Sequence, residues 1–560
     1  MIRSKSATYY LFIPVLFLLV FYIFPMAKIA GYVVEGFLPS TASQPIHWGL
    51  IQKATGFTLY QALLSSLITM LIGLPAAFVF GKYQFIGKPI LRVLFTLPFI
   101  LPTVVVVAGF NALLGPNGWV NVALMRIFHS PAPVINSYGS LGVIILAHVF
   151  YNISVVIRVV ATARERFDPD VINAAALLGA KPHQIFLKII LPILWPHIFS
   201  AFLLVFLFDF TSFGVILMLG GASFTTLEVE IYIQTMQLLN LKMAGVLSLI
   251  QLAFTVLLTV LSGWMENKKN APLSPNLQPM LRKPVSNGDK VFVFCINAIL
   301  IGLLVFPVAA LFLRSITAAD LGQAGGMGLR FTLRYYASLF TNQHDNIFFV
   351  PPLAAVGNSF VFAGTSMLLA VTLGLLVAFS STTGSKWSKG IQTFAMLPLG
   401  TSAVTLGLGF AAAFANNPAL QAWSVFLIPI AHTLVALPFV IRIIQPALGS
   451  IPSHLHDAAM MLGVRPNAVW KYIDLPIIRK PLSSAAIYAF AISLGEFGAT
   501  AFLTTPEFPT IPIAIFRSLN LPGSLNYGKA LALSVILLLV CAAGFILIDW
   551  MQGEDWLPQI

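Results

Sequence analysis

The sequence predicts an all-α polytopic membrane protein with about twelve transmembrane helices, arranged as two parallel six-helix repeats. Hydrophobic residues make up 58% of the 560-residue chain and charged residues only 9%, whereas soluble domains hold about a quarter charged residues. Apolar runs recur that are long enough, at roughly twenty residues, to cross a bilayer of ~30 Å as helices. Helices satisfy their own backbone hydrogen bonds in lipid. Motifs of the first six runs return in the last six, which indicates an internal repeat.

The first apolar run follows Arg3 and Lys5 and is too long for the core of a signal peptide. We therefore interpret it as an uncleaved first transmembrane helix. The spans expected in the first half are 8–34, 58–80, 92–114, 140–161, 196–219 and 243–265. The spans expected in the second half are 291–315, 357–380, 391–414, 424–446, 482–504 and 527–549.

A polar stretch rich in Pro, Asn and Lys separates the two sets of runs and has no apolar period, which is typical of a linker. The expected organisation is a first repeat at 1–266, with its core at about 56–266, and a second repeat at 291–560, with its core at about 354–550. The cytoplasmic linker between them is expected at 267–290.

The second half repeats the first in register. His148 returns as His432, and Thr226-Leu227 returns as Thr510-Ile511 after the same interval along the chain. We call this interval, from His148 to His432, the repeat displacement. Because each half has an even number of helices, both halves have the same orientation. The sequence therefore predicts a parallel repeat about an axis along the membrane normal.

Most of the 31 Lys and Arg residues fall in segments on one side of the expected spans. The positive-inside tendency places these segments, and both termini, in the cytoplasm. The net charge of +13 follows from these loops and does not indicate a nucleic-acid surface. Cys295 and Cys541 lie inside apolar runs, so the sequence favours neither a disulfide framework nor a metal site.

Two cytoplasmic segments, one after the fourth span of each half, share the pattern Ala-Ala, three residues, Gly, nine residues, Ile-x-Leu-Pro. A pair of small Ala residues lets another surface approach a helix closely. Gly179 and Gly463 suit helix ends where the backbone takes positive φ. The pattern residues are Asn173, Ala174, Ala175, Gly179, Ile189, Leu191 and Pro192, and Asp457, Ala458, Ala459, Gly463, Ile473, Leu475 and Pro476.

Each segment is expected to form a helix–turn–helix at the inner membrane surface. Pro182 and Pro466 follow the glycines by three residues and suit the first turn of a second helix. Asp457 is expected to open its first helix as a cap and dipole partner, and Asn173 to supply the cap in the other segment.

This pattern resembles the signature loop of binding-protein-dependent ABC importer permeases. The resemblance implies a type I importer transmembrane fold, in which each loop forms a coupling helix that docks on an ATP-binding subunit. Asn173 stands where the family usually has Glu. The implied partners are two ATP-binding subunits and one extracytoplasmic solute-binding protein, in a bacterial inner membrane.

The segments 148–152 and 495–499 resemble the fused permeases of ferric-iron and thiamine uptake, in which one chain supplies both membrane halves. The resemblance implies transport of either solute. The sequence has no Gly-x-x-x-x-Gly-Lys-Ser/Thr loop, because Ala530 follows Gly528-Lys529 where a hydroxyl is needed. We therefore expect no enzyme activity and no cofactor bound by this chain, with ATP used by the partner subunit.

Four side chains inside the expected spans are candidates for the transport pathway or its gating: Asp209, Glu496, His148 and His432. A charge inside a membrane helix is costly unless it is paired or hydrated, so such residues are often functional. A hydrogen-bonded packing role between helices is the alternative for all four. At the repeat displacement, the equivalent of Glu496 is Ser212.

Two other classes of protein were weighed. A gradient-driven secondary transporter of the major-facilitator type also has twelve helices in two parallel halves and would use intramembrane acids such as Asp209 and Glu496. It gives no reason for two matched cytoplasmic loops. A membrane enzyme that processes lipid would need catalytic groups clustered at a membrane surface, which the sequence does not indicate.

Overall fold

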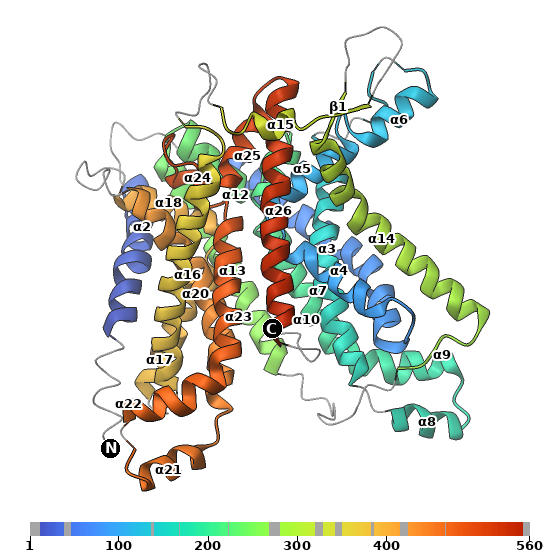
Figure 1. Ribbon diagram of the computed structural model, residues 1–560, viewed down its shortest axis with the longest axis vertical. Coiled ribbons are helices and arrows are strands. Elements are labelled where there is room, and N and C mark those ends of the chain that lie inside the picture. Colours follow the sequence, from blue (N-terminus) through green and yellow to red (C-terminus); the bar gives the residue numbers. More distant parts are fainter. Residues whose placement is uncertain are drawn as a thin grey trace.

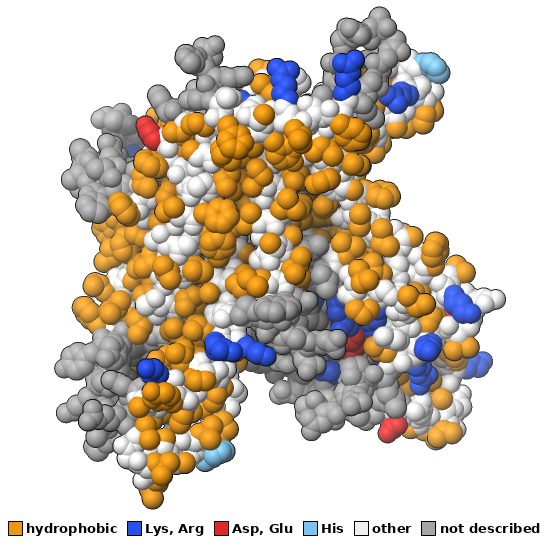
Figure 2. Space-filling view, viewed as in Figure 1, with side chains coloured by type: hydrophobic (Ala, Val, Ile, Leu, Met, Phe, Trp, Pro, Cys, Tyr) orange, Lys and Arg blue, Asp and Glu red, His pale blue; other side chains and the backbone are white. Residues whose placement is uncertain are grey.

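A computed structural model describes residues 12–37, 46–130, 132–135, 139–166, 169–221, 223–267, 281–319, 329–341, 350–381, 386–414, 424–464 and 466–552. In these segments eleven helices are long and apolar enough to cross a membrane, or up to twelve if one sharply bent pair counts as a single span. Hydrophobic side chains cover the middle of the molecule, with Lys and Arg toward its two ends (Figure 2). The predicted all-α membrane fold is confirmed.

The first half of the chain begins with a span at Phe12–Val34, which includes two elements with assigned bounds. These are η1 (Leu19–Ile23) and α2 (Phe24–Phe37). The elements that follow are α3 (Trp48–Lys82), α4 (Lys88–Ile100), α5 (Thr103–Leu114), α6 (Trp119–Ile127), α7 (Leu141–Glu165), α8 (Pro169–Leu177), α9 (Pro182–Ile185), η2 (Phe186–Ile190), α10 (Leu191–Phe210), α11 (Gly214–Leu219), α12 (Leu227–Tyr232), η3 (Ile233–Gln237) and α13 (Leu241–Asn267).

The second half has a similar order of long helices, and its described residues include an antiparallel pair of short strands. Its first elements are α14 (Asn287–Ser315), β1 (Thr317–Ala319), β2 (Leu329–Phe331), α15 (Arg334–Ala337), α16 (Ala354–Ser381), α17 (Lys386–Met396), η4 (Leu397–Gly400) and α18 (Ala403–Phe414). The remaining elements are α20 (Ser424–Gly449), α21 (Ser453–Met461), α22 (Pro466–Val469), η5 (Trp470–Asp474), α23 (Leu475–Gly495), α24 (Thr500–Leu503), α25 (Ile511–Asn520) and α26 (Ser524–Gln552).

The third span of each half is broken, where the sequence predicted one helix at 92–114 and one at 391–414. In the second half the two limbs are bent by 99°. The Ser402 hydroxyl accepts a hydrogen bond from the Thr405 backbone N–H at 3.0 Å, which caps α18. In the first half, Leu101 precedes Pro102, and a residue before proline is disfavoured in a helix.

The fifth spans differ from the predicted 196–219 and 482–504. Each begins earlier, in the second helix of the segment that carries the repeated Ala-Ala and Gly pattern, and ends earlier, at Phe210 or Gly495. The chain then breaks before the short helices α11 and α24. Glu496 therefore lies just beyond its helix in extended conformation, at φ −69° and ψ 123°, and not inside it as predicted. Apolar composition continues through both breaks, so hydropathy could not locate them.

The first helix of each half packs against the third span of the other half. An added Cβ on Gly409 in α18 would lie 3.1 Å from the Cβ of Pro25 in α2. An added Cβ on Gly109 in α5 would lie 3.0 Å from the carbonyl oxygen of Pro307 in α14. Figure 1 shows this exchange, with α2 beside α18 and α14 beside α5. The two halves are thereby joined by more than the linker.

The described end of the linker lies against the end of α3. The Arg282 backbone N–H donates to the Lys82 carbonyl at 3.0 Å, and the Gln84 N–H donates to the Arg282 carbonyl at 2.9 Å. The Tyr83 hydroxyl donates to Asp289 Oδ1 at 2.6 Å. The helix α14 begins at Asn287, before the predicted boundary at 291. Most of the predicted linker, at 268–280, lies outside the described residues.

Candidate functional site

The two short helices α8 and α21 lie at the same end of the molecule, opposite α6, α15 and β1 (Figure 1). They carry the Ala-Ala pairs of the repeated pattern, Ala174-Ala175 and Ala458-Ala459. The side chains of Asn173, Ala174, Asp457 and Ala458 are exposed. Both segments thus present their pattern residues on one face of the protein.

Each short helix ends in the same hydrogen-bonded turn. Gly179 and Gly463 have φ of +82° and +73°, as their sequence positions predicted. The N–H of Ala180 donates to the Ala175 carbonyl at 3.1 Å, and the N–H of Val464 donates to the Ala459 carbonyl at 3.0 Å. This six-to-one bond across a left-handed glycine is the Schellman arrangement that terminates helices.

The predicted caps are wrong. The helix α8 begins at Pro169 and α21 at Ser453, four residues before Asn173 and Asp457. Proline favours the first turn of a helix, and Pro169 and Pro452 start these helices at or beside their first residue. Asn173 and Asp457 consequently lie within their helices and not at the caps.

The second helix of each segment continues directly into the membrane. Ile189 lies in the π-helical turn η2, and Leu191 and Pro192 start α10. In the second half, Ile473 lies in η5, and Leu475 and Pro476 start α23 in the same way. A π turn is wider than an α turn and often accompanies a proline, which has no N–H to donate. In both halves the helix after the glycine turn therefore runs without interruption into the fifth span.

An aromatic contact fixes this continuous helix onto the second span of the same half. In the first half, the rings of Phe186 and Phe78 lie 5.4 Å apart. In the second half, the rings of Trp470 and Phe379 lie 4.6 Å apart, edge to face. Phe186 and Trp470 are equivalent, since the repeat displacement separates them. The chain that follows α8 or α21 therefore forms the fifth span and also contacts the second span of the same half.

The two segments differ beneath their short helices. His456 Nε2 lies 2.5 Å from Asp474 Oδ1, which joins α21 to η5. The equivalent positions in the first half hold Ile172 and Ile190, which are apolar. The second segment is therefore held by a polar pair where the first has only apolar side chains.

The C-terminal ends of α8 and α21 carry exposed apolar side chains. Leu177 and Leu178 are each 89% exposed, and their equivalents Met461 and Leu462 are 89% and 82% exposed. Large apolar side chains at this level of exposure, paired on one face and flanked by polar residues, are typical of a protein-binding surface. The geometry fits two matched contacts with a two-fold partner.

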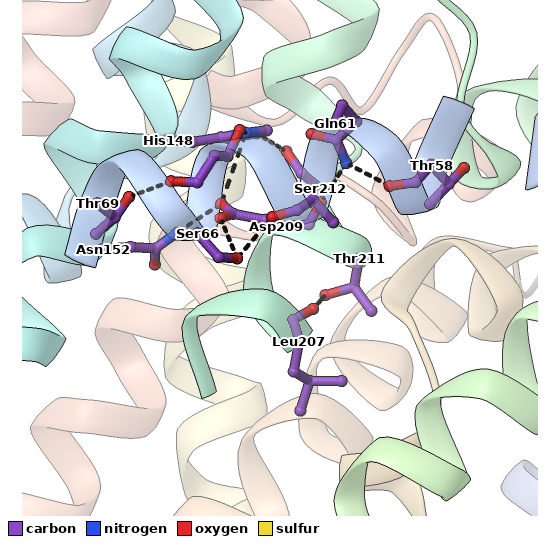
Figure 3. A network of polar contacts seen from close by, with 12 residues as sticks. Thr58, Gln61, Ser66, Thr69, His148, Asn152, Leu207, Asp209, Thr211 and Ser212 are labelled. Atoms are coloured by element: carbon purple, nitrogen blue, oxygen red, sulfur yellow. Dashed lines mark hydrogen bonds and ion pairs between the residues drawn. The ribbon is translucent and has the colours of Figure 1, made fainter. Parts of the chain in front are cut away.

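A second set of candidates forms a buried polar cluster in the first half (Figure 3). His148 in α7 contacts Ser65 through Nδ1 at 3.0 Å and Ser212 through Nε2 at 2.8 Å. Asp209, in the last turn of α10, lies 3.5 Å from the same Nδ1. Its carboxylate accepts from the Asn152 amide at 2.7 Å and from the Ser66 hydroxyl at 3.3 Å. The cluster joins the second, fourth and fifth spans.

The second half has a matching cluster around His432 in α20. Its Nδ1 contacts the Ser493 hydroxyl at 2.7 Å, and its Nε2 contacts Thr500 Oγ1 at 2.8 Å. Glu496 Oε2 lies 3.3 Å from that Nε2. Because the Thr500 hydroxyl donates to Glu496 at 2.8 Å, His432 Nε2 must be the donor to Thr500. The Nε2 atom of His432 therefore carries a proton.

The Glu496 carboxylate also caps the short helix α24. Its Oε1 accepts from the Ala499 N–H at 2.9 Å, and its Oε2 accepts from the Thr500 N–H at 3.0 Å. All four candidates are buried, with exposed fractions of 2% for His148, 0% for Asp209, 1% for His432 and 7% for Glu496. In this conformation the four side chains therefore make hydrogen bonds around the breaks that follow the fifth spans, and they do not face solvent.

Sequence reasoning missed the contact between Phe213 and Phe497, which directly follow Ser212 and Glu496. Their rings stack with centroids 5.4 Å apart and an interplanar angle of 21°. We call these two residues the axial pair. With 46 Phe residues in the chain, composition gave no reason to choose these two. The available signal was their separation along the chain, which equals the repeat displacement.

Comparison with known proteins shows which family the sequence matches. The family described as "binding-protein-dependent transport system inner membrane component" matches residues 69–268 and 370–553. The thiamine transport system permease protein ThiP of Brucella abortus is 26% identical over 89% of this chain and 87% of its own length. The protein of the same name from Haemophilus influenzae is 26% identical over 91% of this chain and 90% of its own. The ferric transport system permease protein FbpB of Actinobacillus pleuropneumoniae is 25% identical over 97% of this chain and 78% of its own.

Proposed function

Because the chain belongs to the family of binding-protein-dependent transport system inner membrane components, we propose that it imports a small solute by alternating access driven by separate ATPase subunits. It is a multi-pass membrane permease of the ABC class and not an enzyme. The family match argues against the gradient-driven transporter of the major-facilitator type. The observation that carries the proposal is the pair of matched helices, α8 and α21, on one face of the fold.

The proposed solutes are thiamine and ferric iron, delivered by one extracytoplasmic binding protein. Support comes from relatives that are named for these two solutes and that align over most of this chain. Affinity for the solute is proposed to reside mostly in the binding protein. The permease then supplies the path and the conformational change, with no covalent step.

The coupling residues are proposed to be those of the repeated pattern. Each ATPase subunit receives one short helix, with the exposed Leu177 and Met461 inserted into its surface. When ATP draws the two ATPases together, α8 and α21 approach each other. The continuous helices behind them carry this motion to the fifth spans and to the breaks that hold Asp209 and Glu496. These two acids, with His148 and His432, are proposed to act in gating.

This arrangement requires α8, α21 and both termini to be cytoplasmic, as the distribution of Lys and Arg predicts. The outer end, with α6, α15 and the strand pair β1–β2, would then receive the binding protein. The proposed permease repeats are those predicted from the sequence, at 1–266 and 291–560.

Site-specific crosslinking tests the proposal. Cys295 and Cys541 are first replaced by Ser, and a single Cys is introduced by Leu177→Cys or Met461→Cys. The membrane is treated with a reagent that carries a thiol-reactive group at one end and a photoactivated group at the other, and it is then illuminated. The tagged chain is purified from this membrane in mild detergent. We expect each variant to crosslink to the same ATPase, recovered at two copies per permease. The matched control is Phe340→Cys, which is 68% exposed near α15 at the opposite end of the fold.

The control variant is expected to give no crosslink to the ATPase. Recovery of the chain without an ATPase would contradict the proposal, especially if uptake survived ATP depletion and stopped when the proton gradient was removed. A crosslink from Phe340→Cys but not from Leu177→Cys would show that the assigned orientation is reversed.

A further inference from the structure

The axial pair marks the axis that relates the two halves. Phe213 and Phe497 occupy equivalent positions, since the repeat displacement separates them along the chain. Equivalent residues touch each other only where they lie beside the symmetry axis, as in a two-fold interface. Their stacked rings therefore close the centre of the protein, between the two bodies that alternating access must separate.

Further aromatic rings pack against the axial pair, and they come from equivalent positions in the two halves. Tyr232 lies 5.5 Å from Phe213, and its equivalent Phe516 lies 5.3 Å from Phe497. Phe502 meets Tyr232 edge to face at 5.6 Å across the two halves. The centre of the protein is thus lined by aromatic faces supplied by both repeats.

The segments that carry the axial pair are closely packed against the third span of their own half. An added Cβ on Gly214 would lie 2.7 Å from the Thr103 hydroxyl, and one on Gly498 would lie 3.0 Å from the Ala403 Cβ. The residues immediately before the pair, Ser212 and Glu496, are bonded into the two histidine clusters. Each ring therefore moves with its own half, so separating the halves exposes two opposed aromatic faces.

From this geometry we propose that the axial pair selects the transported solute by stacking on it, and that the solute class is a flat heteroaromatic ring. The inference rests on the proposed importer function, and of the two solutes named there it selects thiamine. Two opposed rings stack favourably on a planar aromatic ring placed between them. Ferric iron would find no oxygen or nitrogen ligand on a phenyl face.

The test uses proteoliposomes that contain the permease with its copurified ATPase and binding protein. Uptake of labelled thiamine and of ferric iron supplied as its citrate complex is measured beside ATPase stimulation by the binding protein. We expect ATP-dependent uptake of thiamine, and a decrease of about tenfold in the double variant F213L/F497L, since two aromatic faces are lost. The variant F213Y/F497Y keeps the faces and is expected to retain uptake.

Phe254→Leu is the matched control, because its ring packs 5.5 Å from Phe210 within the first half. It is expected to leave thiamine uptake unchanged. Wild-type uptake by F213L/F497L, or ATP-dependent uptake of iron and not thiamine by the unaltered complex, would overturn the inference while leaving the importer intact. If the unaltered complex neither stimulates its ATPase nor takes up either probe, the proposed function itself fails, and this inference with it.

Discussion

Asp209 and Ser493 occupy equivalent positions in the two halves, and each faces the Nδ1 atom of the histidine in its own half. Asp209 Oδ1 lies 3.5 Å from His148 Nδ1, and Ser493 Oγ lies 2.7 Å from His432 Nδ1. One turn later the order is reversed, with Ser212 in the first half and Glu496 in the second. At these two positions of the fifth span, each half therefore keeps one acid and one serine beside its histidine, in exchanged order.

This exchange predicts unequal effects when each acid is replaced by its amide. Both Glu496 oxygens accept backbone N–H groups, so Glu496→Gln turns an NH2 group toward a donor and leaves one N–H unpaired. We expect a loss of about 1–3 kcal/mol in the free energy of unfolding. Asp209→Asn is expected to cost less, because the Ser66 hydroxyl that faces it can accept as well as donate.

Thermal unfolding of the two amide variants in detergent, followed by circular dichroism, measures the difference. Asp209→Ala serves as the control, since it leaves the buried Asn152 amide without its 2.7 Å acceptor and should lower the midpoint as Glu496→Gln does. Equal midpoints for Asp209→Asn and Glu496→Gln would contradict the assigned hydrogen bonds.

The sequence predicted the repeat and most spans, because hydropathy and motif spacing are local properties. It failed where a helix ends inside an apolar run. The fifth spans end at Phe210 and Gly495, just before Ser212 and Glu496, whose side chains contact the histidine of their own half. Average hydropathy does not detect such contacts. The packing of α2 on α18 was also beyond prediction, since it depends on contacts between residues far apart in the chain.

The sequence identified the candidate residues but not the contacts between them. Asp209, Glu496, His148 and His432 stood out as polar groups in apolar runs, and the structure places them in two clusters, one in each half. Sequence alone left open whether they pack between helices, as they do in this conformation. The axial pair was missed because a Phe within an apolar run does not differ in character from its neighbours.

A second prediction concerns the glycines that end α8 and α21. Gly179 and Gly463 have positive φ and open space around them, so Ala there meets backbone strain but no clash. We expect Gly179→Ala and Gly463→Ala each to cost about 1–2 kcal/mol locally and to lower ATPase stimulation by the binding protein. Asn tolerates this conformation, so Gly463→Asn should recover most of the stimulation.

Gly87 provides the matched control, because its φ is +86° and nothing lies near its missing Cβ. It lies in the turn between α3 and α4, outside the two segments that carry the repeated pattern. Gly87→Ala carries the same local strain and is expected to leave ATPase stimulation unchanged. A decrease equal to that of Gly463→Ala would mean that strain anywhere in the cytoplasmic loops impairs turnover.

A third prediction concerns the junction between the halves. The Tyr83 hydroxyl accepts from Lys82 Nζ at 2.7 Å and donates to Asp289 Oδ1 at 2.6 Å. Burial first, and then the hydrogen bond and charge of Asp289, raise the pKa of Tyr83 to about 12. Because the folded value exceeds the value of 10.0 for an unperturbed tyrosine, this stabilisation is complete below pH 10 and is lost as pH rises toward 12.

Tyr83→Phe is expected to lower the free energy of unfolding by about 1–2 kcal/mol at neutral pH, since it removes a hydrogen bond to a charged group. A double-mutant cycle with Asp289→Asn checks this through thermal unfolding. The two losses should be less than additive, because both substitutions remove the same contact. Strict additivity would show that Tyr83 and Asp289 act independently.

The last prediction concerns the polar pair beneath α21. His456→Ala would leave Asp474, whose side chain is only 5% exposed, without its 2.5 Å partner. An unpaired buried carboxylate costs about 1–3 kcal/mol, so α21 should be held less firmly and ATPase stimulation by the binding protein should fall. The first half performs the same structural task with Ile172 and Ile190 in these positions.

The double variant H456I/D474I copies the first half into the second and supplies the matched comparison. It removes both polar partners together, which avoids an unpaired buried group. We therefore expect ATPase stimulation to return toward the unaltered level, although His456→Ala alone lowers it. If the double variant were as impaired as His456→Ala, the polar pair itself would be required. The two segments would then differ in how they transmit the motion of the ATPases, and not only in how their short helices are held.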